Sequence, residues 1–337
     1  MVAWPLLTMH IHDTIVSSLG IVLNSLLLYL IYSSNNKHLR QMSTALCQNA
    51  VLDILLSTMT LIIQPQVYIT SNVCVFILQP HVSLPKVIYF FMFYCFGGQI
   101  TLSMYAMPVP FYVRYLIVCA RRNVRYRDLI YPYFLVFTCF LIICIGTGWC
   151  FPFDQQFQEQ FVPLFNASPV FGGNVSALPI FAANRVSAKP MLFFYTFVFC
   201  SLTITYSIVV FLAYKISTSM DFLPTITVKV KKYNRQLHRA LLIQAIGPLF
   251  AGVLPVIVLA SMVLLNFESV YATLGISICV AWIPVVTPIA AIWVIKPYRE
   301  RFSKMMCAQF TNPSSSIPSN YAITVPKLRV PKSTIEQ

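Results

Sequence analysis

Seven long apolar stretches divide the chain, and short polar or charged segments separate them. They lie at about 14–34, 43–63, 87–118, 131–151, 190–214, 240–265 and 270–295. A helix of roughly 20 apolar residues crosses a hydrocarbon core about 30 Å thick. Inside lipid only helices and closed barrels satisfy every backbone N–H and C=O, and barrel strands would alternate in hydropathy over about ten residues. The continuous runs therefore predict an all-α membrane protein built as a bundle of seven transmembrane helices.

One further apolar segment, Val67–Leu78, is too short to cross a bilayer as a helix. Pro65 and Pro80 flank it. We expect it to be a loop or an interfacial segment.

Composition agrees with a membrane protein, because 58% of the 337 residues are apolar and 9% are charged. A soluble domain carries about 25% charged residues. The net charge of +14 follows from topology and from attraction to anionic lipid, so we expect no nucleic-acid partner.

The basic residues fix the predicted orientation. Of the 23 Lys and Arg residues, only Lys86, Arg185 and Lys189 fall on one side of the predicted membrane. Lys and Arg are retained in the cytoplasm, so the N-terminus is predicted outside and the C-terminus inside. The sequons at Asn166 and Asn174 lie in a predicted outer loop, where they could be glycosylated.

This topology predicts four segments. Beyond the last span, Phe302, Met305, Met306 and Phe310 share one helical face, as in a helix lying in the membrane interface. The segments are an extracellular N-terminus (1–13), the seven-helix bundle (14–296), a short amphipathic interfacial helix (297–311) and a disordered cytoplasmic tail (312–337).

Few polar residues lie deep within the spans. Asp53 is the one carboxylate predicted at such depth, Asn49 precedes it by one helical turn, and Asn24 lies at a similar depth. We interpret these three as a polar cluster facing the bundle interior, which binds water or a sodium ion. A purely structural hydrogen-bond cluster is the equally weighted alternative.

The ten cysteines show no metal-binding spacing, and we expect neither a metal nor a cofactor. Cys74 and Cys150 lie toward the outer face, where the compartment is oxidising, and could form a disulfide.

Arg114 stands in the stretch FYVRYLIVCARR, at the predicted cytoplasmic mouth of the third span and between Tyr112 and Tyr115. Arg114 lies at least one helical turn deeper in the predicted membrane than the basic pair Arg121 and Arg122. We therefore expect it to be more than a topological anchor.

Three motifs, quoted as they stand in this sequence, carry a resemblance. PFYVRYLIVC (Pro110–Cys119), QLHRALLIQAIGPLF (Gln236–Phe250) and IWVIKPYRERF (Ile292–Phe302) are similar to segments of nematode serpentine chemoreceptors of the Str superfamily, including the Str and Srd families. These are G-protein-coupled receptors. Two features differ from rhodopsin-like receptors. Val113 rather than an acidic residue precedes Arg114, and the last span has Thr287-Pro288-Ile289 where those receptors have the motif Asn-Pro-x-x-Tyr.

The resemblance implies an olfactory-type receptor in the plasma membrane of sensory-neuron cilia. It would bind an odorant-like or pheromone-like small molecule and signal through a heterotrimeric G protein. Depth in the outer half of the bundle suggests the ligand-lining residues Phe93, Tyr94, Gln99, Tyr195 and Tyr271. The predicted G-protein contacts are Arg114, Tyr115, Arg121, Arg122, Lys231, Lys232 and Arg239.

Three other functions are weighed against the receptor. A small-solute transporter would show repeats and several buried ionisable groups, and a ligand-gated channel of the insect type would have the opposite orientation. An enzyme would need paired aspartates or a metal motif. The five histidines are all predicted outside the spans: His10, His12, His38, His81 and His238. Transporter and channel remain the alternatives.

Overall fold

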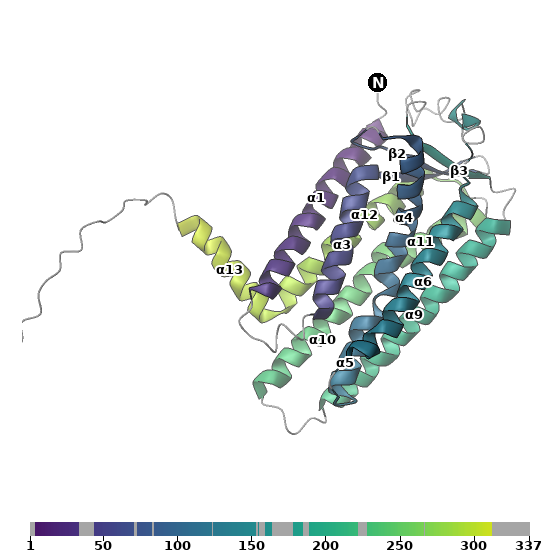
Figure 1. Cartoon of the computed structure of the whole chain (residues 1–337). Helices are drawn as coiled ribbons and strands as arrows, with labels where there is room; N and C mark the ends of the chain where they lie inside the picture. The colour runs from purple at the N-terminus through teal and green to yellow at the C-terminus, as the bar shows by residue number, and fades with distance from the viewer. Residues whose placement is uncertain are drawn as a thin grey trace, which may run out of the picture.

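The computed structural model describes residues 4–33, 44–70, 73–82, 84–122, 124–152, 154, 159–163, 178–184, 189–221, 228–265 and 267–311. Within these ranges, seven helical stretches are long and apolar enough to cross a membrane, which confirms the predicted bundle (Figure 1). The crossing elements are α1 (Trp4–Tyr32), α3 (Thr44–Ile63), α4 (Lys86–Tyr105) continued by α5 (Pro108–Val118), α6 (Tyr126–Cys150), α9 (Lys189–Asp221), α10 (Val228–Pro248) continued by the π-helix η2 (Leu249–Val253) and α11 (Leu254–Leu264), and α12 (Val270–Val294).

The first helix is longer than predicted. It begins at Trp4 rather than near residue 14, so His10, His12 and Asp13 belong to it. The prediction that no histidine lies within a span is therefore wrong for His10 and His12, and His238 stands at the very start of the sixth. Asp53 is not the one intramembrane carboxylate either, because the span includes Asp13.

After the last span the chain forms the helix α13 (Lys296–Thr311), and its place in the membrane interface stays a prediction. Asn166, Asn174 and the tail 312–337 lie outside the described residues.

The segment predicted as a loop or interfacial stretch is instead β-structure. Strands β1 (Pro65–Thr70) and β2 (Val73–Leu78) pair antiparallel, and β3 (Ile180–Asn184) pairs antiparallel with β2 from the other side. The run is rich in Val, Ile, Tyr and Phe, the residue types favoured on a pleated surface. The loop prediction failed because a run too short for a membrane helix can still pair with a strand far away in sequence.

The turn from α3 into β1 is set at Gln64. Its φ of 42° lies in the left-handed region, and the Pro65 that follows disfavours helical backbone at Gln64. The amide N–H of Gln79 donates to the carbonyl of Ile63 at 3.1 Å, which ties the end of β2 back to α3.

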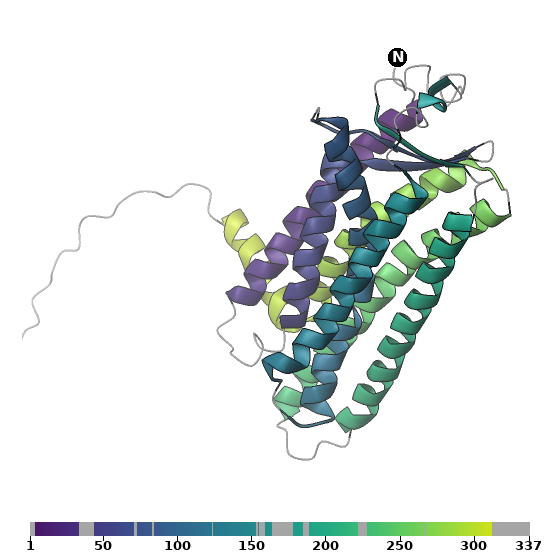
Figure 2. The same cartoon turned by 45° about the vertical axis from the view of Figure 1, so that its right-hand side comes forward.

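The sheet lies across one end of the bundle, beside the N-terminal part of α1, while α5 and α13 lie at the opposite end (Figures 1 and 2). We call these the sheet end and the arginine end. Each half of the bundle has its own buried core: Phe93, Phe96 and Ile283 belong to the core toward the sheet end, and Phe111 and Tyr298 to the other.

Two crossings are interrupted, and proline is present at both interruptions. Pro108 begins α5 and has no N–H for the preceding turn. In the sixth crossing Pro248 and Pro255 flank the π-helix η2, where Gly252 packs against Met104 of α4 and Ile283 of α12. A side chain on Gly252 would collide with Met104, so glycine lets this irregular turn approach its neighbours closely.

Close packing between α4 and α6 makes a test of the bundle. A Cβ on Gly98 would meet the Cys144 sulfur and the Phe140 ring, whereas one on Gly275 meets nothing within 4 Å. We expect Gly98→Leu to reduce the free energy of unfolding by about 1–3 kcal/mol through overpacking, measured as a lower thermal midpoint of the purified protein in detergent. Gly275→Leu is the matched control, and equal midpoints for the two variants would contradict the packing described.

Candidate functional site

A cavity lies beneath the sheet, inside the sheet end of the bundle. Its volume is about 140 Å³, and its walls come from every crossing helix and two strands. Pro65, Val67 and Phe76 of the sheet line it on one side, and Phe93 and Tyr195 line it from α4 and α9.

Aromatic rings pack the junction between this cavity and the sheet. The Phe93 ring centroid lies 5.0 Å from that of Phe76, 4.5 Å from that of Phe181 and 5.5 Å from that of Phe151. Contacts of this kind add to simple area burial. Phe93 therefore couples the cavity wall to strands β2 and β3.

Hydroxyl groups in the cavity are already used as donors. Thr101 donates to the carbonyl of Gly98 at 2.9 Å and Thr147 to that of Ile143 at 2.8 Å. Ser277 donates to the carbonyl of Thr273 at 3.3 Å and accepts from the backbone N–H of Val67. What these groups still offer a guest is acceptor oxygen, within walls that are otherwise aliphatic and aromatic.

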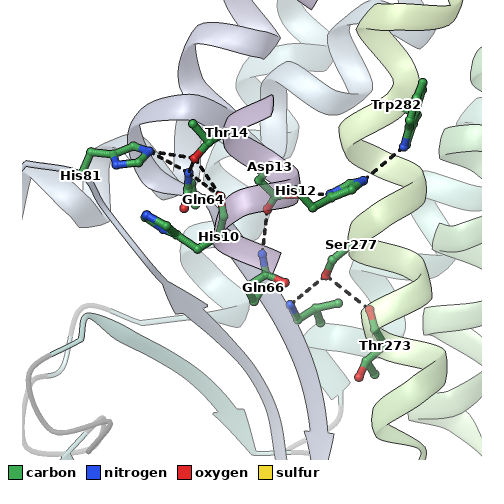
Figure 3. A network of polar contacts seen from close by, with 11 residues as sticks. His10, His12, Asp13, Thr14, Gln64, Gln66, His81, Thr273, Ser277 and Trp282 are labelled. Carbon is green, nitrogen blue, oxygen red and sulfur yellow. Dashed lines mark hydrogen bonds and ion pairs between the residues drawn. The ribbon is translucent and has the colours of Figure 1, made fainter. Parts of the chain in front are cut away.

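A polar network fixes the sheet to α1 and α12 (Figure 3). Asp13 also lines the cavity and is only 2% exposed. Its Oδ2 accepts from Nε2 of Gln66 at 2.7 Å, and its Oδ1 lies 2.9 Å from Nδ1 of His12. On the other side of the imidazole, Nε1 of Trp282 donates to Nε2 of His12 at 3.2 Å.

This arrangement assigns the tautomer of His12. An indole N–H can only donate, so Nε2 of His12 is the acceptor and Nδ1 carries the proton given to Asp13. Both oxygens of the Asp13 carboxylate are thus engaged by hydrogen bonds from neutral groups.

A second set of polar side chains at the sheet end joins α1 to the turn before β1 and to the segment after β2. Nε2 of Gln64 donates to Oγ1 of Thr14 at 2.8 Å, and the His10 and His81 rings lie 4.6 Å apart (Figure 3). Nearby, burial raises the pKa of the Tyr68 phenol in β1 above its ordinary value, and the negative charge of Asp13 adds a smaller effect in the same direction. The Tyr68 phenol therefore stays protonated.

The predicted polar cluster is buried but not joined by direct contacts among the described residues. Nδ2 of Asn24 donates to the carbonyls of Gly20 and Pro284 at 2.9 and 2.7 Å. Asp53 hydrogen-bonds to Thr287, and Asn49 faces the sulfur of Met107 at 4.0 Å. The three side chains join different helix pairs, and a sodium ion or water among them stays a prediction.

At the arginine end, Arg114 of α5 is only 5% exposed and lies within electrostatic reach of His238 of α10. Nε2 of His238 is 2.8 Å from Oγ of Ser217 of α9, and its ring lies 6.5 Å from that of Phe111. Arg114 thus stands where α5, α9 and α10 meet.

The other predicted G-protein contacts are spread around this end. Tyr115 is half-buried, and Arg121, Arg122 and Arg239 are exposed. Arg122 pairs with Asp128 at 2.7 Å, and Asp128 also accepts from the N–H of Arg125 at the start of α6. Lys231 and Lys232 lie on α10, but their side chains are outside the described part.

The predicted ligand residues divide in two. Phe93 and Tyr195 line the cavity. Tyr94 donates to the carbonyl of Phe151 at 2.7 Å, Gln99 donates to that of Leu52 at 3.1 Å, and neither is among the lining residues. Tyr271 is 88% exposed and does not line the cavity. It was chosen by its depth along the helix, and depth does not tell which way a side chain points.

Asp13, Gln66 and Trp282 were not among the predicted site residues. The sequence pattern placed the start of the first helix near residue 14 and predicted no sheet. The apolar run that continues back to Trp4 is the signal that would have extended the helix. Cys74 and Cys150 are buried, and no disulfide joins them in the structure.

Seven crossing helices, with a cavity at one end and a buried arginine at the other, place the chain among multi-pass membrane proteins of the G-protein-coupled-receptor type. Comparison with family models gives a match over residues 9–303 to the serpentine type 7TM GPCR chemoreceptor Str. The chain belongs to this family, as its three motifs suggested, and the family is one of receptors rather than enzymes. A comparison with curated proteins finds no match.

The bond between Gln66 and Asp13 can be tested directly. Hydrogen bonds to a charged group contribute about 1.5–3 kcal/mol, so Gln66→Leu should free β1 from α1 and speed amide hydrogen exchange in β1 and β2 by about tenfold or more. Gln99→Leu, which loses a neutral bond elsewhere in the bundle, is the control. Unchanged exchange in the sheet after Gln66→Leu would show that the bond does not fix it.

Proposed function

We propose that the protein is a chemosensory G-protein-coupled receptor of the sensory-neuron plasma membrane, placed in cilia. A small uncharged molecule binds in the cavity under the sheet, on the outer side, and a heterotrimeric G protein binds the arginine end in the cytoplasm. The family supports the class of function. The observation that carries the proposal is the cavity itself, because α11 forms part of its wall and continues through η2 into the helix that holds His238.

Cavity volume sets the size of the ligand. At about 140 Å³ it is close to an engineered apolar cavity of about 150 Å³ that binds benzene. A ligand of about six to eight non-hydrogen atoms therefore fits. The lining is mostly aliphatic and aromatic, so a charged ligand would lose its hydration with little compensation there, and an anion would in addition face the buried Asp13 carboxylate.

The irregular sixth crossing offers a route from ligand to G protein. Val256 and Leu259 of α11 line the cavity, and a guest that displaces them moves the segment beyond η2. At the far end of the same crossing His238 lies within electrostatic reach of Arg114. A ligand with higher affinity for one placement of α11 would shift the population of both ends together.

The G protein would meet exposed basic residues around Arg114. Arg121, Arg122 and Arg239 supply positive charge there, and Tyr115 and the α10 residues Lys231 and Lys232 complete the proposed surface. Movement of α10 away from α5 would uncover Arg114, which is buried in the structure.

Filling the cavity tests the ligand site. Val198 of α9 lines it and is 3% exposed, whereas Ile204 of the same helix faces outward at 62%. In cells carrying a calcium reporter and screened with small odorants, Val198→Trp should raise the half-maximal concentration at least about tenfold by occupying the site. Ile204→Trp should respond as the wild type does.

A loss of response caused by poor folding of the Val198→Trp variant is distinguished from a blocked ligand site by measuring surface expression and by testing Val198→Ala. The smaller residue enlarges the cavity, so the response should shift toward larger odorants. Unchanged potency and unchanged ligand size preference in both variants would contradict the proposed site.

Removing the buried arginine tests coupling. Arg114→Ala should abolish the calcium response while leaving odorant-induced thermal stabilisation of the purified receptor intact, because the residue lies at the end remote from the cavity. Arg301→Ala, which loses a bond to Ser33, is the control. Odorant currents that persist with G-protein signalling blocked would identify a channel instead, and substrate uptake without signalling would identify a transporter.

A further inference from the structure

The cavity has a barrier on its sheet side. Val67 and Phe76 of the sheet line it there, and the sheet is bonded to α12 through Val67 and Ser277 and to α1 through Gln66 and Asp13. A molecule entering through the sheet end must break these bonds or displace the Phe76–Phe93 ring contact.

A second hollow lies against the same cavity from the membrane side. This α9–α11 groove has a volume of about 760 Å³ and is bounded by α9 on one side and by η2 and α11 on the other. Tyr195 and Val256 line both the groove and the cavity. These two side chains therefore lie at the boundary between the two spaces.

The groove faces the hydrocarbon of the bilayer. Phe199, Val210 and Phe211 line it and are more than half exposed in the bundle, as lipid-facing residues of a crossing helix are. All of its lining residues are uncharged, so an apolar molecule can leave the lipid and enter the groove without meeting an ion.

One polar group of the groove lining has an unused hydrogen-bonding capacity. The hydroxyl of Tyr206 is buried, and within the described residues it has no hydrogen-bond partner. The hydroxyls of Thr203 and Ser207, by contrast, donate to carbonyls of their own helix at 2.8 Å. A buried phenol without an acceptor is costly, and a passing carbonyl, ester or ether oxygen would satisfy it.

We propose that the α9–α11 groove is a membrane-side portal, through which uncharged ligands dissolved in the bilayer reach the cavity past Tyr195 and Val256. The inference rests on the proposed function, because it takes the cavity as the ligand site. It adds the ligand class: neutral molecules that partition into lipid and carry an oxygen acceptor. Each methylene group raises the bilayer concentration of such a molecule about fourfold over water, which favours this entrance.

The test measures how fast the cavity fills. An uncharged alkyl diazirine of about seven heavy atoms is mixed rapidly with the receptor in lipid nanodiscs and photolysed after increasing delays. Mass spectrometry then quantifies labelling of the cavity segment of α4, Phe93–Thr101. Ala260 of α11 lines only the groove, whereas its neighbour Ser261 lines neither space and is exposed.

Ala260→Phe should slow labelling of this segment about tenfold by narrowing the portal, with the same final extent, because entry and exit slow together. Ser261→Phe should label at the wild-type rate. A second pair on the opposite wall repeats the comparison if the first variant folds poorly: Thr203→Phe in the groove and Ile204→Phe outside it.

Equal rates for the groove variants and their controls would overturn the portal. So would faster filling in Gln66→Leu with no effect of Ala260→Phe or Thr203→Phe, because that result identifies entry through the sheet end. Labelling is read without a G protein, so a failure of signalling leaves the portal standing. Absence of cavity labelling in every variant would overturn the ligand site, and the portal with it.

Discussion

Inside a bilayer, a backbone carbonyl that loses its helical partner has no water to bond, and the protein itself must supply a donor. Pro288 has no N–H, so the carbonyl of Pro284, four residues earlier, loses its usual partner in α12. The amide of Asn24 donates to that oxygen from α1 at 2.7 Å. A buried asparagine thus compensates for a proline 264 positions later in number, and α1 and α12 are joined at that depth.

The same constraint explains where the bundle is irregular. Backbone breaks occur between α4 and α5 and at η2, and one face of η2 is packed inside the bundle: Gly252 of η2 contacts Met104, close to the end of α4. The two irregular crossings therefore meet in the middle of the bundle, between the cavity and Arg114. A change in one can be accommodated by the other, which is the physical basis for relating the two ends.

At the sheet end, the polar groups that need partners belong to strands rather than to helices. Three short strands at the end of a helical bundle leave polar edges, and Ser277 of α12 accepts a hydrogen bond from the N–H of Val67 in the edge strand β1. His12 links Trp282 to Asp13, and Asp13 in turn holds Gln66 of β1. The sheet end is thereby fixed without a disulfide among the described residues, and the cavity keeps a rigid wall on that side. The groove between α9 and α11 has no comparable polar bonding in its lining beyond hydroxyls that bond within their own helix.

Hydropathy by itself determined the seven crossings, because the need for about 20 apolar residues per span depends on local composition and on nothing distant. The three motifs likewise identified the receptor family. Phe93 and Tyr195, which were chosen by depth alone, line the cavity, and their contact with a ligand stays a prediction. The strand pairing of Cys74 with Ala183, the burial of Asp13 and the outward direction of Tyr271 were decided by the tertiary structure. Each depends on contacts between segments far apart in the sequence, or on the rotation of a helix about its axis, which a nearly uniform apolar sequence leaves unspecified.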